Sequence, residues 1–424
     1  MKILLINYFF PPAIDAHAYR WHQLMRYWSG QGHEVDVITS GDFEDEVFAE
    51  SHRFSSITRL GRKRKQHSAV YVEKKRTLRN DIKAVLLTMY RKVYWPDAFW
   101  HWIFPLTVAL FKRRKVRYDL IVSYYPCLLA HIGASYLHSR QKENETRWIA
   151  DYGDPFSTSD SMQPNNFALY KKINIFVERL ILKRCSAVVF TNETTASDYV
   201  QAKICEQEKV SVIPHLVDIN SFYVGSKSSL LDKTSDIPTI RLIYIGGFHK
   251  GIREPDQLFD LVKAVNGLGV SLELDIYGPA NGYDFGMYDL GNINHHGIIA
   301  RELVPTAIEA ADFVVNVDNI NCSMTPSKIV ELIATGKPIV NIGAKNTPHK
   351  LFSRYENEGY CFNYDHVESH ENGYAKIADF LRKNTGRHAS IDIVKAVLDG
   401  YDLQDIASQY ITAVGELGVS GELK

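Results

Sequence analysis

The sequence lacks the short motifs that mark several common enzyme classes. It has no C-x-x-C, no H-E-x-x-H and no P-loop, and its five cysteines are scattered without paired spacing. No G-x-G-x-x-G follows the first predicted strand, where a nicotinamide or flavin fingerprint would stand. A disulfide scaffold, a metal centre and a redox cofactor therefore have little support. We expect reduced thiols, no bound metal and no cofactor.

Long apolar runs are missing as well. The opening MKILLINYFFPP is too short for the core and cleavage region of a signal peptide, and it fits a first strand better. The longest apolar stretch, residues 100–111, contains a His and a Pro and is too short to cross a bilayer. We therefore expect a cytoplasmic protein, peripheral at most at the inner face of a membrane.

The chain has no net charge, but the two signs are distributed unevenly. In residues 1–225, 31 Lys and Arg stand against 23 Asp and Glu, and the remaining residues have 18 against 26. This asymmetry suggests that the first half meets an anionic partner, such as a membrane surface or a phosphorylated acceptor. The alternative is two solvated surfaces of opposite sign that attract each other.

The length of 424 residues favours two domains, because a single core rarely grows so large. Strand–helix units run along the first half, pause at a polar stretch, and then restart, which predicts an α/β fold. We predict an N-terminal domain over residues 1–221, a linker over 222–238 and a second domain over 239–400. A helix within 401–424 is expected to cross back onto the first domain.

The most informative stretch is TPSKIVELIATGKPIVNIG, residues 325–343. It predicts a loop, a buried helix that ends at Gly336, and a parallel strand buried on both faces. Lys328 and Glu331 are out of place in so apolar a helix. A lysine at a helix start favours an anion, and a carboxylate one turn later can accept two hydrogen bonds from a ribose diol. The alternative is an ordinary helix with a solvated Lys–Glu pair.

Two further places carry candidate site residues. Gly246 and Gly247 follow a predicted strand and precede Lys250 and Arg253, so that backbone and cations could bind a diphosphate. Residues 147–156, RWIADYGDPF, end a predicted strand in two carboxylates, Asp151 and Asp154. Ligands collect at such strand ends, and we predict that these acids orient an acceptor hydroxyl. The alternative for Asp154 is a turn cap before Pro155.

The stretch 325–343 resembles the donor-site helix of GT-B glycosyltransferases, particularly glycosyltransferase family 4, with its P-x-K-x-x-E-x-x-A-x-G-K-P pattern. The matching positions are Pro326, Lys328, Glu331, Ala334, Gly336, Lys337 and Pro338. The resemblance implies the GT-B fold, with two Rossmann-like domains facing across a cleft. It also implies transfer of a sugar from a nucleotide diphosphate-sugar to an acceptor hydroxyl, with retention of configuration and without a metal.

The resemblance also assigns residues. Glu331 would grip the nucleotide ribose, whereas Ser323 stands where the family has a glutamate for the donor sugar. Arg253 and Lys250 would supply the charge of a family arginine whose place Gly247 takes. The remaining predicted substrate-binding residues are Asp15 and His17 in the first loop, Gly278 and Gly297 after later strands, and Thr325 and Ser327 beside Ser323.

Residues 59–117 resemble the family least. Residues 59–79 contain nine Lys or Arg and one Glu, and Trp and Tyr follow. Interleaved basic and aromatic residues are typical of a membrane face or a site for a lipid-phosphate acceptor. They also suit single-stranded nucleic acid, but the acidic second half disfavours that partner. Alternatively, the aromatic residues form core and the basic runs are solvated.

The predicted function is therefore a glycosyltransferase with a glycan or lipid-linked acceptor, in surface polysaccharide or glycolipid assembly. One rival is a nucleotide-sugar epimerase of the same fold. The other is an inactive, transferase-like binding subunit, which Ser323 in place of the family glutamate keeps open.

Overall fold

The computed structural model describes residues 1–13, 16–41, 53–61, 90, 92–141, 146–158, 163–225, 239–283, 285, 291–320, 328–343, 349–365 and 370–415. The chain forms two compact units. The first contains Met1–His215 and takes in the chain again from Leu403, and the second lies within Leu216–Asp402. Asp15, Ser323, Thr325 and Ser327 lie outside the described residues, as do residues 62–89 and 226–238.

The first unit is built on a seven-stranded parallel sheet of order β3-β2-β1-β4-β5-β6-β7. The strands are β1 (Lys2–Asn7), β2 (Glu34–Ser40), β3 (Ser56–Leu60), β4 (Leu120–Tyr125), β5 (Arg147–Tyr152), β6 (Ala187–Phe190) and β7 (Val210–Val212). The central strands β1, β4 and β5 are buried along nearly their whole length, as expected for apolar runs with helices on both faces.

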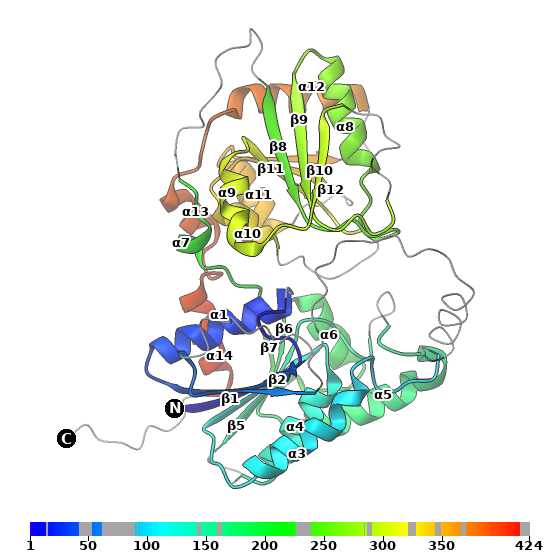
Figure 1. Cartoon of the computed structure of the whole chain (residues 1–424), viewed down its shortest axis with the longest axis vertical. Helices are drawn as coiled ribbons and strands as arrows, with labels where there is room; N and C mark the ends of the chain where they lie inside the picture. The colour runs from blue at the N-terminus through cyan, green and yellow to red at the C-terminus, as the bar shows by residue number, and fades with distance from the viewer. Residues whose placement is uncertain are drawn as a thin grey trace, which may run out of the picture. The chain divides into compact units, whose positions relative to one another are not determined.

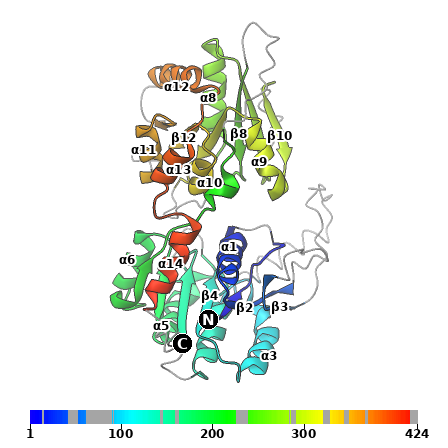
Figure 2. The ribbon, with the colours of Figure 1, turned by 90° about the vertical axis from the view of Figure 1, so that its left-hand side faces the viewer.

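Helices cover both faces of this sheet (Figures 1 and 2). They are α1 (Ala16–Gly30), α3 (Ile103–Arg113), α4 (Leu128–His138), α5 (Phe167–Leu182), α6 (Glu193–Gln201) and α14 (Leu403–Ala413), with short 3-10 turns at Trp100–Trp102 and Gln207–Lys209. α1 packs beside α14, while α4 lies against β4 and between α3 and α5. The last helix of the chain is thus part of the first unit.

The second unit contains a six-stranded parallel sheet of order β10-β9-β8-β11-β12-β13. Its strands are β8 (Ile240–Ile245), β9 (Leu272–Tyr277), β10 (Ile293–Gly297), β11 (Phe313–Val317), β12 (Ile339–Gly343) and β13 (Cys361–Asp365). Its helices are α7 (Ile219–Phe222), α8 (Asp256–Gly267), α9 (Val304–Glu309), α10 (Lys328–Ala334), α11 (Lys350–Asn357), α12 (His370–Asn384) and α13 (Ile391–Val397), with a 3-10 turn at Arg301–Leu303.

The stretch 328–343 folds as its sequence predicts. α10 buries its apolar residues, Gly336 follows it with φ of +74°, and β12 is buried throughout between β11 and β13. A side chain at Gly336 would also press on the ring of Tyr223 and the carbonyl of Ala389. Glycine is therefore required here both by its backbone conformation and by the lack of space.

Candidate functional site

In the second unit, three glycines bring the carboxyl ends of β8, β9 and β10 together. The amide of Gly246 donates to the carbonyl of Tyr277 (2.7 Å), and that of Gly278 donates to the carbonyl of Gly297 (2.8 Å). Gly246 and Gly278 have φ near +150°, and a Cβ on Gly278 would overlap the backbone of Gly246. Only glycine allows so close an approach, so these predicted site residues form one continuous edge of backbone.

Lys328, the first residue of α10, reaches this edge. Its Nζ donates to the carbonyl of Ile245 (2.8 Å) at the place that a side chain on Gly246 would occupy. Burial, and then the charge of Arg253, lower its pKa to about 8, although Glu331 acts in the opposite direction. The ammonium is thus held in a place that costs free energy when no anion is present.

Two more basic side chains lie near Lys328. Arg253 donates through Nη2 to Oδ1 of Asn319 (2.7 Å), which fixes the guanidinium, and its Nε is buried without a hydrogen bond. Burial lowers the pKa of His249, and the charges of Arg253 and Lys328 lower it further. Two cations, Lys328 and Arg253, therefore converge beside Gly246 and Gly247 with a histidine that they keep uncharged. An anion would relieve the repulsion between the two cations.

The other predicted site residues of this unit are not part of the cluster around Lys328. Lys250 is exposed, and a Cβ on Gly247 would lie 3.0 Å from Nδ2 of Asn281, which would have to move. Gly297 has φ of +74° with open space around its Cα.

Glu331 does not form the Lys–Glu pair that was the alternative interpretation. Its Oε1 instead accepts from Nη2 of Arg301 (2.8 Å), whose guanidinium lies over the ring of Phe222.

The first unit holds a separate polar cluster at the carboxyl end of β5. Oδ2 of Asp154 lies 3.3 Å from Nε2 of His17, and Nδ1 of His17 lies 2.7 Å from the hydroxyl of Tyr124. Burial opposes charge on Asp154, but His17 and then His215 lower the pKa of the carboxyl below its ordinary value. Gly153 makes this possible, because a side chain there would overlap Tyr124 and His17. Asp154 is thus an ionised, partly exposed carboxylate with a histidine partner.

Asp151, predicted to be catalytic, is placed differently. Its side chain has no exposed surface, and its Oδ2 accepts from the hydroxyl of Tyr410 (2.8 Å) on α14. Nη2 of Arg20 donates to the same hydroxyl (2.6 Å), and the guanidinium also donates to the carbonyls of Pro214 and Ile213. Burial raises the pKa of Asp151 to about 6, which leaves it ionised at neutral pH. An acceptor has no access to this carboxylate, so its role here is to hold α14.

Solved structures establish what this arrangement of elements is. A glycosyltransferase from Rickettsia africae ESF-5 has a TM-score of 0.62 at 12% identity, with 99% of each chain covered. Anabaena HepE, solved in complex with UDP and glucose, has a TM-score of 0.55 at 14% identity, with 97% of this chain and 98% of that one covered. No curated protein matches the sequence. These similarities show the GT-B fold, with two Rossmann-like domains.

A family model also matches part of the sequence. Residues 18–221 match the model of Glycosyltransferase Family 4. The chain is a GT-B glycosyltransferase that resembles family 4. A putative UDP-N-acetylglucosamine 2-epimerase from Listeria monocytogenes shares the fold at a TM-score of 0.52 and 12% identity, with 97% of this chain and 95% of that one covered. Among the described residues of this glycosyltransferase, no helix has the length and apolar character needed to span a membrane.

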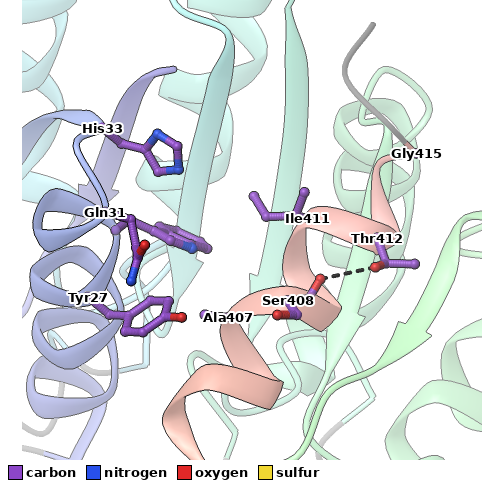
Figure 3. A pocket seen from close by; sticks show the side chains of 9 residues that line it. Tyr27, Gln31, His33, Ala407, Ser408, Ile411, Thr412 and Gly415 are labelled. Atoms are coloured by element: carbon purple, nitrogen blue, oxygen red, sulfur yellow. Dashed lines mark hydrogen bonds between the residues drawn. The ribbon is translucent and has the colours of Figure 1, made fainter. Parts of the chain in front are cut away.

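The first unit of this glycosyltransferase also has a pocket of about 630 Å³ between α1 and α14, lined in part by Tyr27, Gln31, Ser408 and Thr412. In Figure 3 the side chain of Tyr27 points toward α14, and the dashed bond from Thr412 to Ser408 lies within that helix. None of the sequence-predicted site residues lines this pocket.

Sequence reasoning missed Arg301, Asn319 and Tyr410. Arg301 lies four residues after Gly297, at the start of the 3-10 turn that follows β10, and its position after a strand was a usable signal. Asn319 follows β11 in the same way. Tyr410 had no such signal, because its partners Arg20 and Asp151 are hundreds of residues away in the chain.

Proposed function

We propose that this glycosyltransferase transfers a sugar from a nucleoside diphosphate-sugar to an acceptor hydroxyl. The observation that carries the proposal is the convergence of Lys328, Arg253 and His249 beside the backbone of Gly246 and Gly247. Two cations, Lys328 and Arg253, held close together beside a histidine that can donate a hydrogen bond favour a ligand with two adjacent phosphates.

The same side chains would stabilise the leaving diphosphate. When the bond from the sugar to the phosphate oxygen breaks, negative charge develops on that oxygen, and fixed ammonium and guanidinium groups stabilise it. This supports a reaction that requires no divalent metal and no cofactor. We propose that Glu331, oriented by Arg301, accepts hydrogen bonds from the ribose hydroxyls.

Asp154 and His17 are our candidates for the acceptor side. An ionised, partly exposed carboxylate accepts a hydrogen bond from an attacking hydroxyl, and the histidine fixes its orientation. The resemblance to family 4 supports retention of configuration, with attack on the face that the diphosphate leaves. We propose a glycan or lipid-linked acceptor, and a place in surface polysaccharide or glycolipid assembly.

The test is incubation with a panel of nucleoside diphosphate-sugars, with and without glycan acceptors, followed by NMR of the products. The proposal expects a free nucleoside diphosphate together with a glycoside, or slow hydrolysis without an acceptor. An isomerised nucleotide-sugar formed without an acceptor would identify an epimerase. Binding of nucleotide-sugar with no turnover across the panel would identify an inactive binding subunit, the possibility that Ser323 keeps open.

A further inference from the structure

The helix α5 has an unusual distribution of side chains for a helix on the surface of a domain, because it buries polar groups beside Phe167, Ile181 and Leu182 and exposes large apolar ones. Two polar side chains on its inner side, Asn174 and Glu178, have no exposed surface. Its outward side carries four large apolar side chains that are 46–60% exposed: Leu169, Ile173, Phe176 and Leu180. Their spacing of four, three and four residues places them in one stripe along the helix.

The buried polar groups show that this orientation is specified. Oδ1 of Asn174 accepts from Nε1 of Trp95 (2.9 Å), and Asn174 also exchanges hydrogen bonds with Asn165. Glu178 accepts from the hydroxyls of Ser157 and Tyr199. Rotating the helix to bury its apolar stripe would break this network, so the stripe faces outward because of how the core is built.

The apolar surface continues onto α3. This helix exposes Ile103, Phe104, Val108 and Phe111, with Phe104 at 74%. Helices α3 and α5 flank α4 on the same face of the sheet (Figure 1). A short segment next to α5 adds to the surface, because the hydroxyl of Tyr170 donates to the carbonyl of Val93 (2.8 Å).

We call these side chains the α3–α5 face: Tyr90, Val93, Trp100, Ile103, Phe104, Val108, Phe111, Leu169, Ile173, Phe176 and Leu180. They are eleven of the fourteen large apolar side chains exposed in the described part of the chain. So strong a concentration on one side of one unit is not the scattered exposure of an ordinary surface.

Positive charge surrounds this face. Exposed on or directly after α5 are Lys171, Lys172, Arg179, Lys183 and Arg184, and exposed at the end of α3 and after it are Lys112, Lys115 and Arg117. The only carboxylate within either helix is that of Glu178, which is buried. The face therefore offers aliphatic and aromatic side chains next to cations, with no exposed acid on α3 or α5.

We propose that the α3–α5 face docks on a lipid bilayer with anionic headgroups. Apolar side chains enter the boundary between headgroups and acyl chains, while Lys and Arg meet the lipid phosphates. A second copy of the chain fits less well, because a two-fold contact through this face would bring its cations together. Single-stranded nucleic acid fits less well too, since three of the four side chains in the α5 stripe, Leu169, Ile173 and Leu180, are aliphatic and give bases nothing to stack on.

This surface overlaps the one expected from the sequence, residues 59–117, through α3 and the segment before it, including Tyr90, Trp100 and Phe104. The basic run over residues 62–79, one part of the basis of that expectation, lies outside the described residues. The contribution of α5 is new, because this helix lies outside the residues expected to meet a membrane. Docking does not depend on the transfer reaction and can be tested without it. If the enzyme takes a lipid-linked acceptor, the same face would bring it to the plane in which that acceptor lies.

The test is co-sedimentation of the full chain with vesicles, either of phosphatidylcholine alone or of an equimolar mixture with phosphatidylglycerol, over a salt series. We expect the wild type to bind the anionic vesicles, and more weakly as salt rises. The triple variant Ile173→Gln, Phe176→Gln, Leu180→Gln should bind about tenfold more weakly or worse. Reversal of charge at Lys171, Lys172 and Lys183 to Glu should abolish the preference for anionic lipid.

Matched controls are Leu268→Gln for the apolar change and Lys263→Glu with Lys395→Glu for the charge change, all at exposed positions outside this face. The pair Phe104→Gln, Val108→Gln on α3 tests the same face if the α5 variant folds poorly. Absent vesicle binding would overturn the proposal, as would binding that neither apolar variant weakens. A dimer in sedimentation velocity that the apolar variants dissociate, without vesicle binding, would assign the face to a second copy instead.

Discussion

At the scale of single residues, the proposed diphosphate site depends on one lysine that occupies the space left free by one glycine. Lys328 can hold its Nζ over Ile245 only because Gly246 has no side chain in that space. Arg253 then lies near enough to lower the pKa of the lysine further. Because a diphosphate removes the repulsion between these cations, it should bind more tightly here than at a site without such repulsion. Two predictions follow from this.

Replacing Lys328 or Arg253 by Ala should weaken binding of a nucleoside diphosphate by roughly 1.5–3 kcal/mol, the value of a hydrogen bond to a charged group. Isothermal titration calorimetry with UDP and other nucleoside diphosphates measures this. Lys250→Ala is the control, because Lys250 is exposed and its loss should cost well under half as much. Equal affinity of all three variants and the wild type would rule out the diphosphate site.

The affinity for the nucleotide should also depend on pH through Lys328. With a pKa of about 8 in the free protein, this lysine is protonated at neutral pH and loses its proton as the pH rises through 8. A bound diphosphate favours the charged form, so affinity should stay level below pH 8 and fall above it, with proton uptake on binding. Titrations in buffers of different ionisation enthalpy detect this uptake. It should be missing in Lys328→Arg, and its presence there would exclude Lys328 as the source.

Asp154 and Asp151 lie three residues apart in the sequence, but only Asp154 is exposed enough for an acceptor to reach it. Asp154→Asn should lower the rate of transfer roughly a hundredfold with nucleotide affinity little changed, because it removes the charge that meets the acceptor and pairs with His17. Steady-state kinetics with a saturating donor measures the rate, and the exposed Asp198→Asn is the control. A rate equal to that of the wild type would remove Asp154 from the reaction.

At the scale of elements, the first unit is completed by the last helix of the chain. Tyr410 of α14 packs against Trp21 of α1, with ring centroids 5.1 Å apart, and its hydroxyl joins Arg20 to Asp151. One hydroxyl thus forms hydrogen bonds with two buried charged groups. The carboxylate that the sequence suggests for catalysis is used in this way to dock a helix.

Tyr410→Phe should therefore destabilise the first unit by about 1–3 kcal/mol, because it removes one partner from each of two buried charged groups. Urea denaturation followed by tryptophan fluorescence gives the free energy of unfolding. Tyr27→Phe on α1 is the control, since its ring is only partly buried, and it should stay within about 0.5 kcal/mol of the wild type. A Tyr410→Phe variant as stable as the wild type would mean that this hydrogen-bond network makes no net contribution to the free energy of unfolding.

At the scale of the whole molecule, the two units have separate hydrophobic cores. The core of the first is built around Trp148 and Tyr152, and those of the second lie on the two sides of its own sheet. The proposed diphosphate site uses residues of the second unit alone, so a ligand should stabilise the two units unequally.

Calorimetry of thermal unfolding should accordingly show two transitions, only one of which moves up when a nucleoside diphosphate is added. At a ligand concentration a hundred times Kd, the gain is about 2.7 kcal/mol for the binding unit. Tyr410→Phe should lower the other transition and leave the ligand-sensitive one in place. A shift of both transitions by the nucleotide to the same extent would contradict this separation.

The sequence alone determined the elements and the kind of fold. The apolar run over 339–343, the stop at Gly336 and the restart of strand–helix units predicted β12, the end of α10 and the Rossmann-like repeats, because periodicity and glycine chemistry act over a few residues. The tertiary structure alone decided how distant side chains are used. Arg301 rather than Lys328 pairs with Glu331, Tyr410 takes Asp151 away from an acceptor, and Asn174 and Glu178 turn the apolar stripe of α5 outward. Each of these depends on contacts between residues far apart in the chain, which no local pattern encodes.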